Sequence, residues 1–94
     1  MYYRVTVIHF DPSKRDAFYA AADATREEMK AIEGIQSIRS VEVADGEAIV
    51  FAEYQTQEQA DKARPTVQRI LGGALGSFMV KPPDMKAGPV TWEM

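Results

Sequence analysis

Residues 34–60 read GIQSIRSVEVADGEAIVFAEYQTQEQA, and this stretch decides the fold. It contains two runs rich in β-branched residues, and the pair Asp45-Gly46 separates them. Asp-Gly between two such runs is typical of a two-residue β-hairpin turn. Thr56 follows the second run and Gln59 stands three residues later, a spacing typical of a capped helix start. The stretch therefore predicts a hairpin that leads into a helix.

A two-residue turn at Asp45-Gly46 would also decide which side chains share a face of the hairpin, because side chains alternate along a strand. One face would carry Ser37, Arg39, Val41, Val43, Ala48, Val50, Ala52 and Tyr54. The other would carry Ile38, Ser40, Glu42, Ile49, Phe51 and Glu53. Both faces are apolar near the middle, so we expect both to be covered.

The flanking sequence adds a strand and a helix before the hairpin, and a helix and a strand after it. Residues 2–10 are β-branched and aromatic and predict a strand, whereas residues 13–33 carry apolar side chains at helical spacing. Pro65 predicts a break in the second helix, because proline inside a helix costs about 3 kcal/mol. The last strand is expected within residues 77–80 or 90–93, as an irregular edge strand or a strand plus an arm.

The order β-α-β-β-α-β predicts one α+β domain over residues 1–94, with a ferredoxin-like antiparallel sheet. Both helices of that arrangement cover the same face of the sheet. The second face needs another cover, and a chain of 94 residues has little left to supply it. We therefore expect a homodimer that forms through the open sheet face.

Composition argues against several classes of protein. The net charge is −3 and no basic run occurs, so we expect no nucleic-acid partner. The apolar runs are far shorter than a membrane span, so we expect no membrane association. There is no cysteine and only one histidine, so neither a disulfide nor a metal site is expected, and a cytoplasmic location fits best.

Several short motifs occur in a characteristic order along the chain. They are Phe10-Asp11-Pro12-Ser13-Lys14, Glu33-Gly34, Tyr54 two residues before Thr56, and Gly88-Pro89-Val90-Thr91-Trp92. With the hairpin between them, these motifs resemble the antibiotic-biosynthesis-monooxygenase type of dimeric α/β barrel, over nearly the whole chain. The resemblance implies two sheets that meet across a dimer axis. It also implies a pocket between helices and sheet or at the barrel edge, and oxygenation without metal or flavin, so no cofactor is expected.

The sequence departs from this family where the chemistry would be carried. Quinone-forming members use an asparagine and a tryptophan on the third strand and a tyrosine in the next helix, and these positions fall on Val50, Tyr54 and Ala60. Haem-degrading relatives use an asparagine on the first strand, and that position falls near Thr6, which makes Thr6 a candidate ligand contact. The chain contains no asparagine at all. Neither catalytic set is present, so the catalytic residues stay unknown.

Arg39 and Tyr54 are the principal candidate ligand contacts, with Ser37 opposite Tyr54 on the predicted shared face. Guanidinium offers forked donors and stacks on rings, so this pair suits an anionic or phenolic ligand. The alternative is structural: Arg39 would pair with a carboxylate across the dimer, and Tyr54 would pack over the helix start.

His9 and Trp92 are further candidates. His9 is the only side chain whose ordinary pKa makes it a ready base near neutral pH, although a simple capping or solvent contact also fits its place at a strand end. Trp92 would either contact a ligand or anchor an edge strand or dimer seam. Two hypotheses about function follow. One is a cofactor-independent monooxygenase acting on a small aromatic or phenolic metabolite; the other is a non-catalytic small-ligand-binding or structural dimer.

Overall fold

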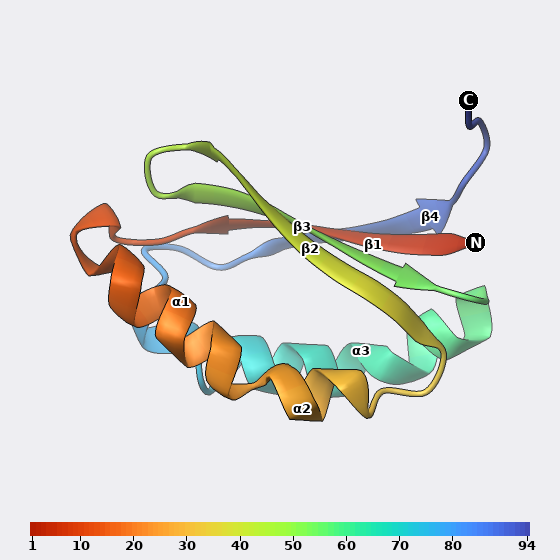
Figure 1. Cartoon of the computed structure of the whole chain (residues 1–94), viewed down its shortest axis with the longest axis horizontal. Helices are drawn as coiled ribbons and strands as arrows, with labels where there is room; N and C mark the ends of the chain where they lie inside the picture. Colours follow the sequence, from red (N-terminus) through yellow and green to blue (C-terminus); the bar gives the residue numbers. More distant parts are fainter.

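A computed structural model describes all of residues 1–94 and contains one four-stranded antiparallel sheet with its helices on a single face (Figure 1). The strands are β1 (Tyr2–His9), β2 (Ile35–Ala44), β3 (Glu47–Tyr54) and β4 (Asp84–Pro89), in the order β2-β3-β1-β4. The helices are α1 (Arg15–Ala24), α2 (Arg26–Lys30) and α3 (Gln57–Gly72), with short 3-10 turns η1 (Pro12–Lys14) and η2 (Gly76–Phe78). This architecture confirms the ferredoxin-like α+β prediction.

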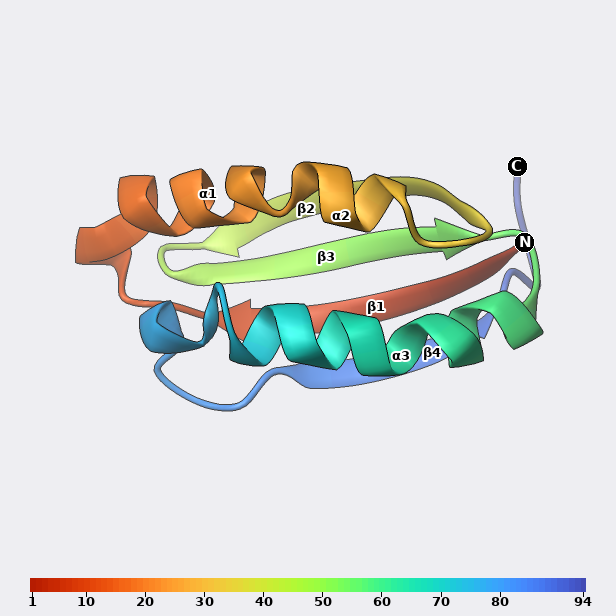
Figure 2. The same ribbon diagram turned by 90° about the horizontal axis from the view of Figure 1, so that it is seen from below.

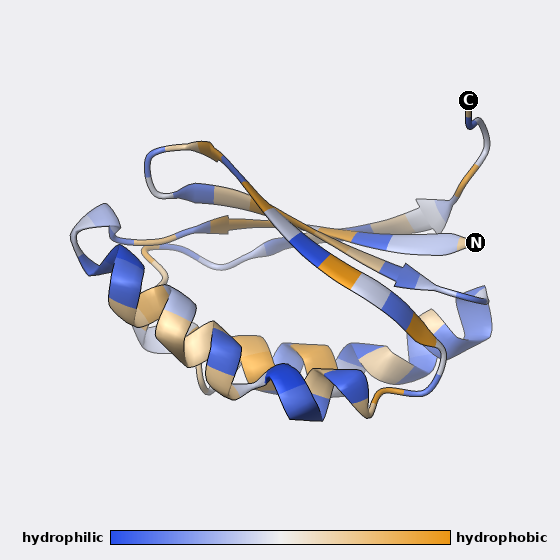
Figure 3. Ribbon diagram, in the orientation of Figure 1, coloured by the Kyte–Doolittle hydropathy of each residue, from blue (hydrophilic) through white to orange (hydrophobic).

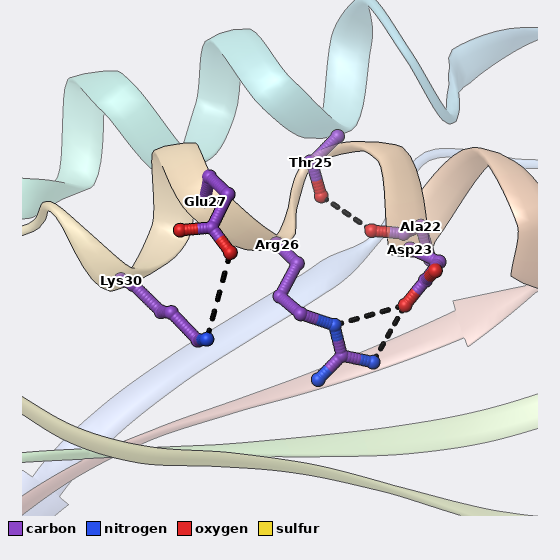
Figure 4. A network of polar contacts seen from close by, with 6 residues as sticks. All are labelled: Ala22, Asp23, Thr25, Arg26, Glu27 and Lys30. Carbon is purple, nitrogen blue, oxygen red and sulfur yellow. Dashed lines mark hydrogen bonds and ion pairs between the residues drawn. The ribbon is translucent and has the colours of Figure 1, made fainter.

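The first helical segment is divided at Thr25 and is not one helix over residues 13–33. The Thr25 hydroxyl donates a hydrogen bond to the carbonyl of Ala22 at 2.7 Å (Figure 4). A threonine that bonds a carbonyl one turn back competes with the backbone ladder and bends helices. The division leaves α1 and α2 as two consecutive helices, both packed over β2 (Figure 2).

The predicted break at Pro65 is wrong, because α3 continues through this residue without interruption. Pro65 is exposed, so its ring meets solvent and not the sheet. The opposite side of α3 buries Ala60, Ala63, Ile70 and Leu71. This burial offsets the lost hydrogen bond.

The predicted start of α3 is confirmed, since the Thr56 side chain accepts a hydrogen bond from the backbone N–H of Gln59 at 3.2 Å.

The last strand lies between the two predicted positions and coincides with neither. Residues 77 and 78 belong to η2, and residues 90–94 form no regular element. β4 starts directly after Pro82-Pro83 and ends at Pro89. As expected, it is an edge strand and is followed by an arm. In Figure 1 the arm leaves the sheet on the side away from the helices.

The turn at Asp45-Gly46 forms as predicted, but the strand pairing beyond it differs from the predicted register. Ala44 faces Glu47, and the next pair is Glu42 with Ala48, so Val43 is an extra residue. Such a β-bulge moves the side chains that follow it to the other face, here as far as a second register shift between Ser37 and Ile35. The predictions that Ser37 lies opposite Tyr54 and that Arg39 shares a face with Tyr54 are therefore wrong. The observed pairs are Arg39 with Phe51 and Ser37 with Glu53.

The two faces of the sheet differ in their environment. The face toward the helices contributes Ile8 and Ala48 to a core with Phe10 and Phe18, whose rings stack at 4.4 Å between centroids. The open face carries the side chains of Tyr3, Val5, Val7, Arg39, Val41, Ile49, Phe51 and Glu53. Figure 3 shows apolar residues at intervals along β2, and they reach both faces, since Ile38 pairs with the buried Ala52 and Val41 with Ile49 of the open face. None of the helices has the combination of length and apolarity that crossing a bilayer requires.

Candidate functional site

A cavity of about 700 Å³ lies between the α1–α2 segment and the strands β2 and β3, and we call it the helix–sheet cavity. Its body is apolar, with Phe18 and Met29 on the helical wall and Ile38 and Val50 on the sheet. Figure 2 shows this wall as the two short helices lying over β2. Volume and lining are those of a pocket for a small, largely apolar molecule.

A phenol with a carboxylate partner stands at one end of this cavity. Tyr19 lines the cavity, and its hydroxyl donates to an Oε1 oxygen of Glu42 at 3.0 Å. Arg15 donates its Nε–H to the same oxygen, also at 3.0 Å. Burial, and then the hydrogen bond to Glu42, raise the pKa of the Tyr19 phenol. The site therefore presents a neutral phenol beside a carboxylate that can accept another hydroxyl.

The bulge at Val43 explains why Glu42 is available to this site. Glu42 pairs with Ala48, which belongs to the buried, helix-facing set of β3. Without the extra residue Glu42 would point to the open face, as the unbulged register predicted. The hydrogen bond to Glu42 is also the main cause that raises the pKa of Arg15, so this guanidinium stays charged. An acceptor carboxylate and a fixed cation thus meet at one point.

Two cations stand at the other end of the cavity. Arg26 and Lys30 extend from α2, and Figure 4 shows each of them beside an acid on the same helical segment. The contacts join Arg26 to Asp23 at 2.6 Å and Lys30 to Glu27 at 3.5 Å. Exposed ion pairs contribute about 0–1 kcal/mol, so a ligand anion can compete for these cations.

Tyr54 does not border the cavity. Its side chain is 0% exposed, and its hydroxyl accepts a hydrogen bond from Nη1 of Arg4 at 2.6 Å. Arg4 also donates to the carbonyl of Ala60 at 2.6 Å and places its guanidinium carbon 5.2 Å from the Tyr54 ring centroid. Burial raises the pKa of Tyr54 against the opposing effect of Arg4. In this structure Tyr54 holds β1, β3 and α3 together.

Arg39 and Ser37 lie on the open face, apart from Tyr54. Nη1 of Arg39 is 3.5 Å from the Ser37 hydroxyl, which donates to Glu53 at 3.4 Å. Tyr3 donates to the second oxygen of Glu53 at 2.8 Å, and this bond is the main cause that raises the Tyr3 pKa. Ser37 also borders the rim of the helix–sheet cavity, whereas Arg39 does not. The structure thus joins two of the predicted contacts in a polar cluster at the sheet edge.

The remaining candidates occupy three separate places. Thr6 is buried on the helix-facing side, between Val50 and Met85 in the sheet. His9 lies at one end of the open face, with Nε2 3.6 Å from an oxygen of Glu47. Trp92 is 79% exposed on the carboxyl-terminal arm. None of the three lines the helix–sheet cavity.

Sequence reasoning missed Tyr19, Arg26 and Lys30, which line the two ends of the cavity. It also missed Glu42, which contacts Tyr19 without lining the cavity itself. Tyr19, Ala22, Arg26 and Met29 follow one another at helical spacing, so the helical wall had a detectable signal. Glu42 had none, because its orientation depends on the bulge. No cluster of three or more histidine, aspartate and glutamate side chains is placed to hold a metal ion.

Comparison with known proteins identifies the architecture. No family model and no curated protein matches the chain. Solved structures match it over nearly its whole length. The chain has the fold of the antibiotic biosynthesis monooxygenases. A candidate antibiotic biosynthesis monooxygenase from Nitrosomonas europaea superposes with a TM-score of 0.78 at 17% identity, covering 98% of this chain and 100% of that one.

Two further structures show the same antibiotic biosynthesis monooxygenase fold. A protein from Mycobacterium tuberculosis has a TM-score of 0.76 at 22% identity, covering 98% of this chain and 96% of that one. A monooxygenase from Streptomyces coelicolor, solved with the ligand nanaomycin D, has a TM-score of 0.78 at 16% identity. That match covers 99% of this chain and 89% of the Streptomyces chain. At such identities the likeness concerns the fold and leaves the activity open.

Proposed function

We propose that the protein binds a small phenolic or other aromatic metabolite in the helix–sheet cavity. The observation that carries this proposal is the combination of an apolar body of about 700 Å³ with polar groups at its two ends. At one end the Tyr19 hydroxyl, which donates to Glu42, can accept a hydrogen bond from a ligand hydroxyl. Arg26 and Lys30 offer positive charge for an acidic or electron-rich substituent at the other. In an apolar cavity, a small number of polar groups that point at the ligand is enough to fix its orientation.

We propose further that the bound metabolite is oxidised by O₂ without a resident cofactor. A ligand phenol that replaces the Tyr19 hydroxyl at Glu42 would transfer its proton to that carboxylate. The resulting phenolate is electron-rich and reduces O₂ directly: one oxygen atom enters the ring to give a quinone, and the other leaves as water. Arg15 keeps Glu42 oriented for this transfer. The likeness in fold to a monooxygenase solved with nanaomycin D supports this chemistry by analogy alone.

A non-catalytic role is the second candidate, and two positions favour it. Val50 offers only an apolar surface to the cavity, and Ala60 is completely buried on the inner side of α3. These positions correspond to the catalytic asparagine and tyrosine of the quinone-forming proteins that the sequence resembles. A ligand held in this cavity would then be stored, carried or sensed, and not converted.

Oxygen uptake and ligand binding separate the two candidates. Simple quinols and phenols are screened with an oxygen electrode, and binding is followed by thermal shift under nitrogen. Tyr19→Phe and Glu42→Gln are the test variants, and Glu58→Gln on the exposed side of α3, outside both the cavity and the open face, is the matched control. Oxidase activity that Glu42→Gln removes and Glu58→Gln preserves supports catalysis. Stabilisation without oxygen uptake supports binding alone, and neither effect with any aromatic compound would refute both candidates.

We also propose that two copies pair through the open sheet face. Val5, Val7, Ile49 and Phe51 are only partly buried there, and Val41 is 48% exposed. A contiguous apolar face of this kind on a chain of 10.5 kDa is typical of an interface. Light scattering at micromolar concentration should give twice the chain mass, and Phe51→Asp should give the monomer. A monomeric parent protein would contradict this pairing.

A further inference from the structure

A second cleft lies beside α3, at the opposite edge of the helical layer from α1 and α2, and we call it the α3–loop cleft. It has a volume of about 690 Å³ and lies between the carboxyl-terminal half of α3 and residues 79–85. Figure 2 shows the connection from η2 to β4 running beside this half of α3. Leu71 lines both this cleft and the helix–sheet cavity, so it forms part of the wall between them.

The charged side chains that line this cleft are all basic. Arg64 enters from α3 and Lys81 from the loop, and the lining contains no carboxylate. The other surface cations are mostly engaged with acids, namely Arg15, Arg26, Lys30, Lys62, Arg69 and Lys86. Neither Arg64 nor Lys81 forms an ion pair. The acid next to the lining, Asp84, lies 3.8 Å from Lys86. In a chain with a net charge of −3, this cleft is therefore a local cationic site.

Apart from Gln68 and two glycines, the rest of the lining is apolar. Leu71, Met79, Pro83 and Met85 are buried or partly buried along the cleft. Gly72 ends α3 at the same place, and the free carbonyls of a helix end carry negative partial charge. An anionic group is thus repelled from the Gly72 end and attracted to Arg64 and Lys81. The apolar part of a ligand would lie over the methionines.

Gly72 also leaves room in the wall of the cleft. A Cβ atom added at Gly72 would meet no heavy atom within 4 Å. A larger side chain is therefore accommodated there without displacing the protein, at a residue that lines the cleft. From the charge, the apolar lining and this open space, we infer that the α3–loop cleft binds a small amphipathic carboxylate. This site is separate from the proposed aromatic site and does not depend on it.

Octanoate and octan-1-ol are suitable probes because they differ in the anionic head and share the alkyl chain. Binding is measured on the ¹⁵N-labelled full chain from amide chemical shifts. We expect octanoate to shift amides of residues 64–85 and to bind more tightly than octan-1-ol. Arg64→Gln and Lys81→Gln should each weaken octanoate binding by about twofold to fivefold, the range for exposed ion pairs. Neither substitution should change the affinity for octan-1-ol, which carries no charge.

Two controls make the outcome decisive. Lys14→Gln removes an exposed cation elsewhere and should leave octanoate binding unchanged. Gly72→Leu should abolish binding of octanoate while the far-UV spectrum and the melting temperature are maintained, because leucine favours a helix more than glycine does. Equal affinity for octanoate and octan-1-ol would overturn the inference. So would shifts mapped outside residues 64–85, an equal loss in Lys14→Gln, or undiminished binding in a folded Gly72→Leu.

Discussion

Replacing Tyr54 by phenylalanine tests the role that the structure gives to this side chain. The change removes the oxygen that accepts a hydrogen bond from Arg4 and leaves the aromatic ring in place. Arg4 as a residue is only 4% exposed and forms no ion pair, so we expect no water to replace the lost acceptor. A hydrogen bond to a charged group contributes about 1.5–3 kcal/mol. For a domain of this size, a loss of about 2 kcal/mol lowers the melting temperature by about 8–16 °C.

The assay is thermal and urea unfolding followed by circular dichroism at 222 nm, at one protein concentration because a dimer would make stability concentration-dependent. Tyr19→Phe is the matched control, since the Tyr19 hydroxyl also forms a hydrogen bond with a charged partner, here as the donor and in a partly exposed setting. We expect a loss of about 0.5–1.5 kcal/mol for Tyr19→Phe. If Tyr54→Phe costs no more than Tyr19→Phe, the buried Arg4–Tyr54 contact does not stabilise the fold as argued.

Three other predictions concern stability. Pro65→Ala should raise the free energy of unfolding by about 1–3 kcal/mol, because it restores a backbone hydrogen bond within α3. Gly34→Ala should lower it by about 1 kcal/mol or more, since Gly34 has a φ of +83° and a Cβ there would lie 2.1 Å from the Gln59 side chain. The raised pKa values of Tyr19 and Tyr54 predict stability that is fully present below about pH 10 and falls at higher pH, because the unfolded chain ionises its phenols first.

These outcomes are read from urea midpoints, and the phenols also from absorbance at 295 nm during alkaline titration. An unchanged midpoint for Pro65→Ala would mean that α3 is interrupted in solution. Gly72→Ala is the control for Gly34→Ala, since a Cβ at Gly72 meets no atom and should be tolerated. Four tyrosines that all titrate near pH 10, with no loss of stability beyond it, would contradict the burial assigned to Tyr19 and Tyr54.

Local signals in the sequence predicted the topology well. Asp45-Gly46 and the spacing of Thr56 and Gln59 each act over a few residues, and the structure has both the turn and the cap. The break predicted at Pro65 failed because tertiary burial of the other side of α3 outweighs a local penalty. The last strand was misplaced because an exposed edge strand such as β4 needs few apolar residues.

The candidate site was much less predictable, and Val43 is the main reason. Val41, Val43 and their neighbours alternate equally well with or without a bulge, so the sequence contains no sign of the extra residue. The predicted Arg39–Tyr54 pair depended on that register. The Tyr19–Glu42 contact depends on it too, and also on how α1 lies over β2. Contacts between distant elements require the three-dimensional arrangement, which periodicity alone does not supply.

The bulge at Val43 also affects how residue roles can be transferred to this chain by alignment. The part of β2 before Val43 is shifted by one residue in its pairing with β3 relative to the part after it. A second shift of this kind occurs between Ile35 and Ser37. An alignment that runs through β2 without allowing for these extra residues assigns the positions between the two shifts, residues 37–42, to the wrong side of the sheet. At identities of 10–22%, only superposition of backbones can place the gaps correctly. Functional residues compared across this fold should therefore be matched by the direction of their Cα–Cβ bonds, and not by their count from the turn.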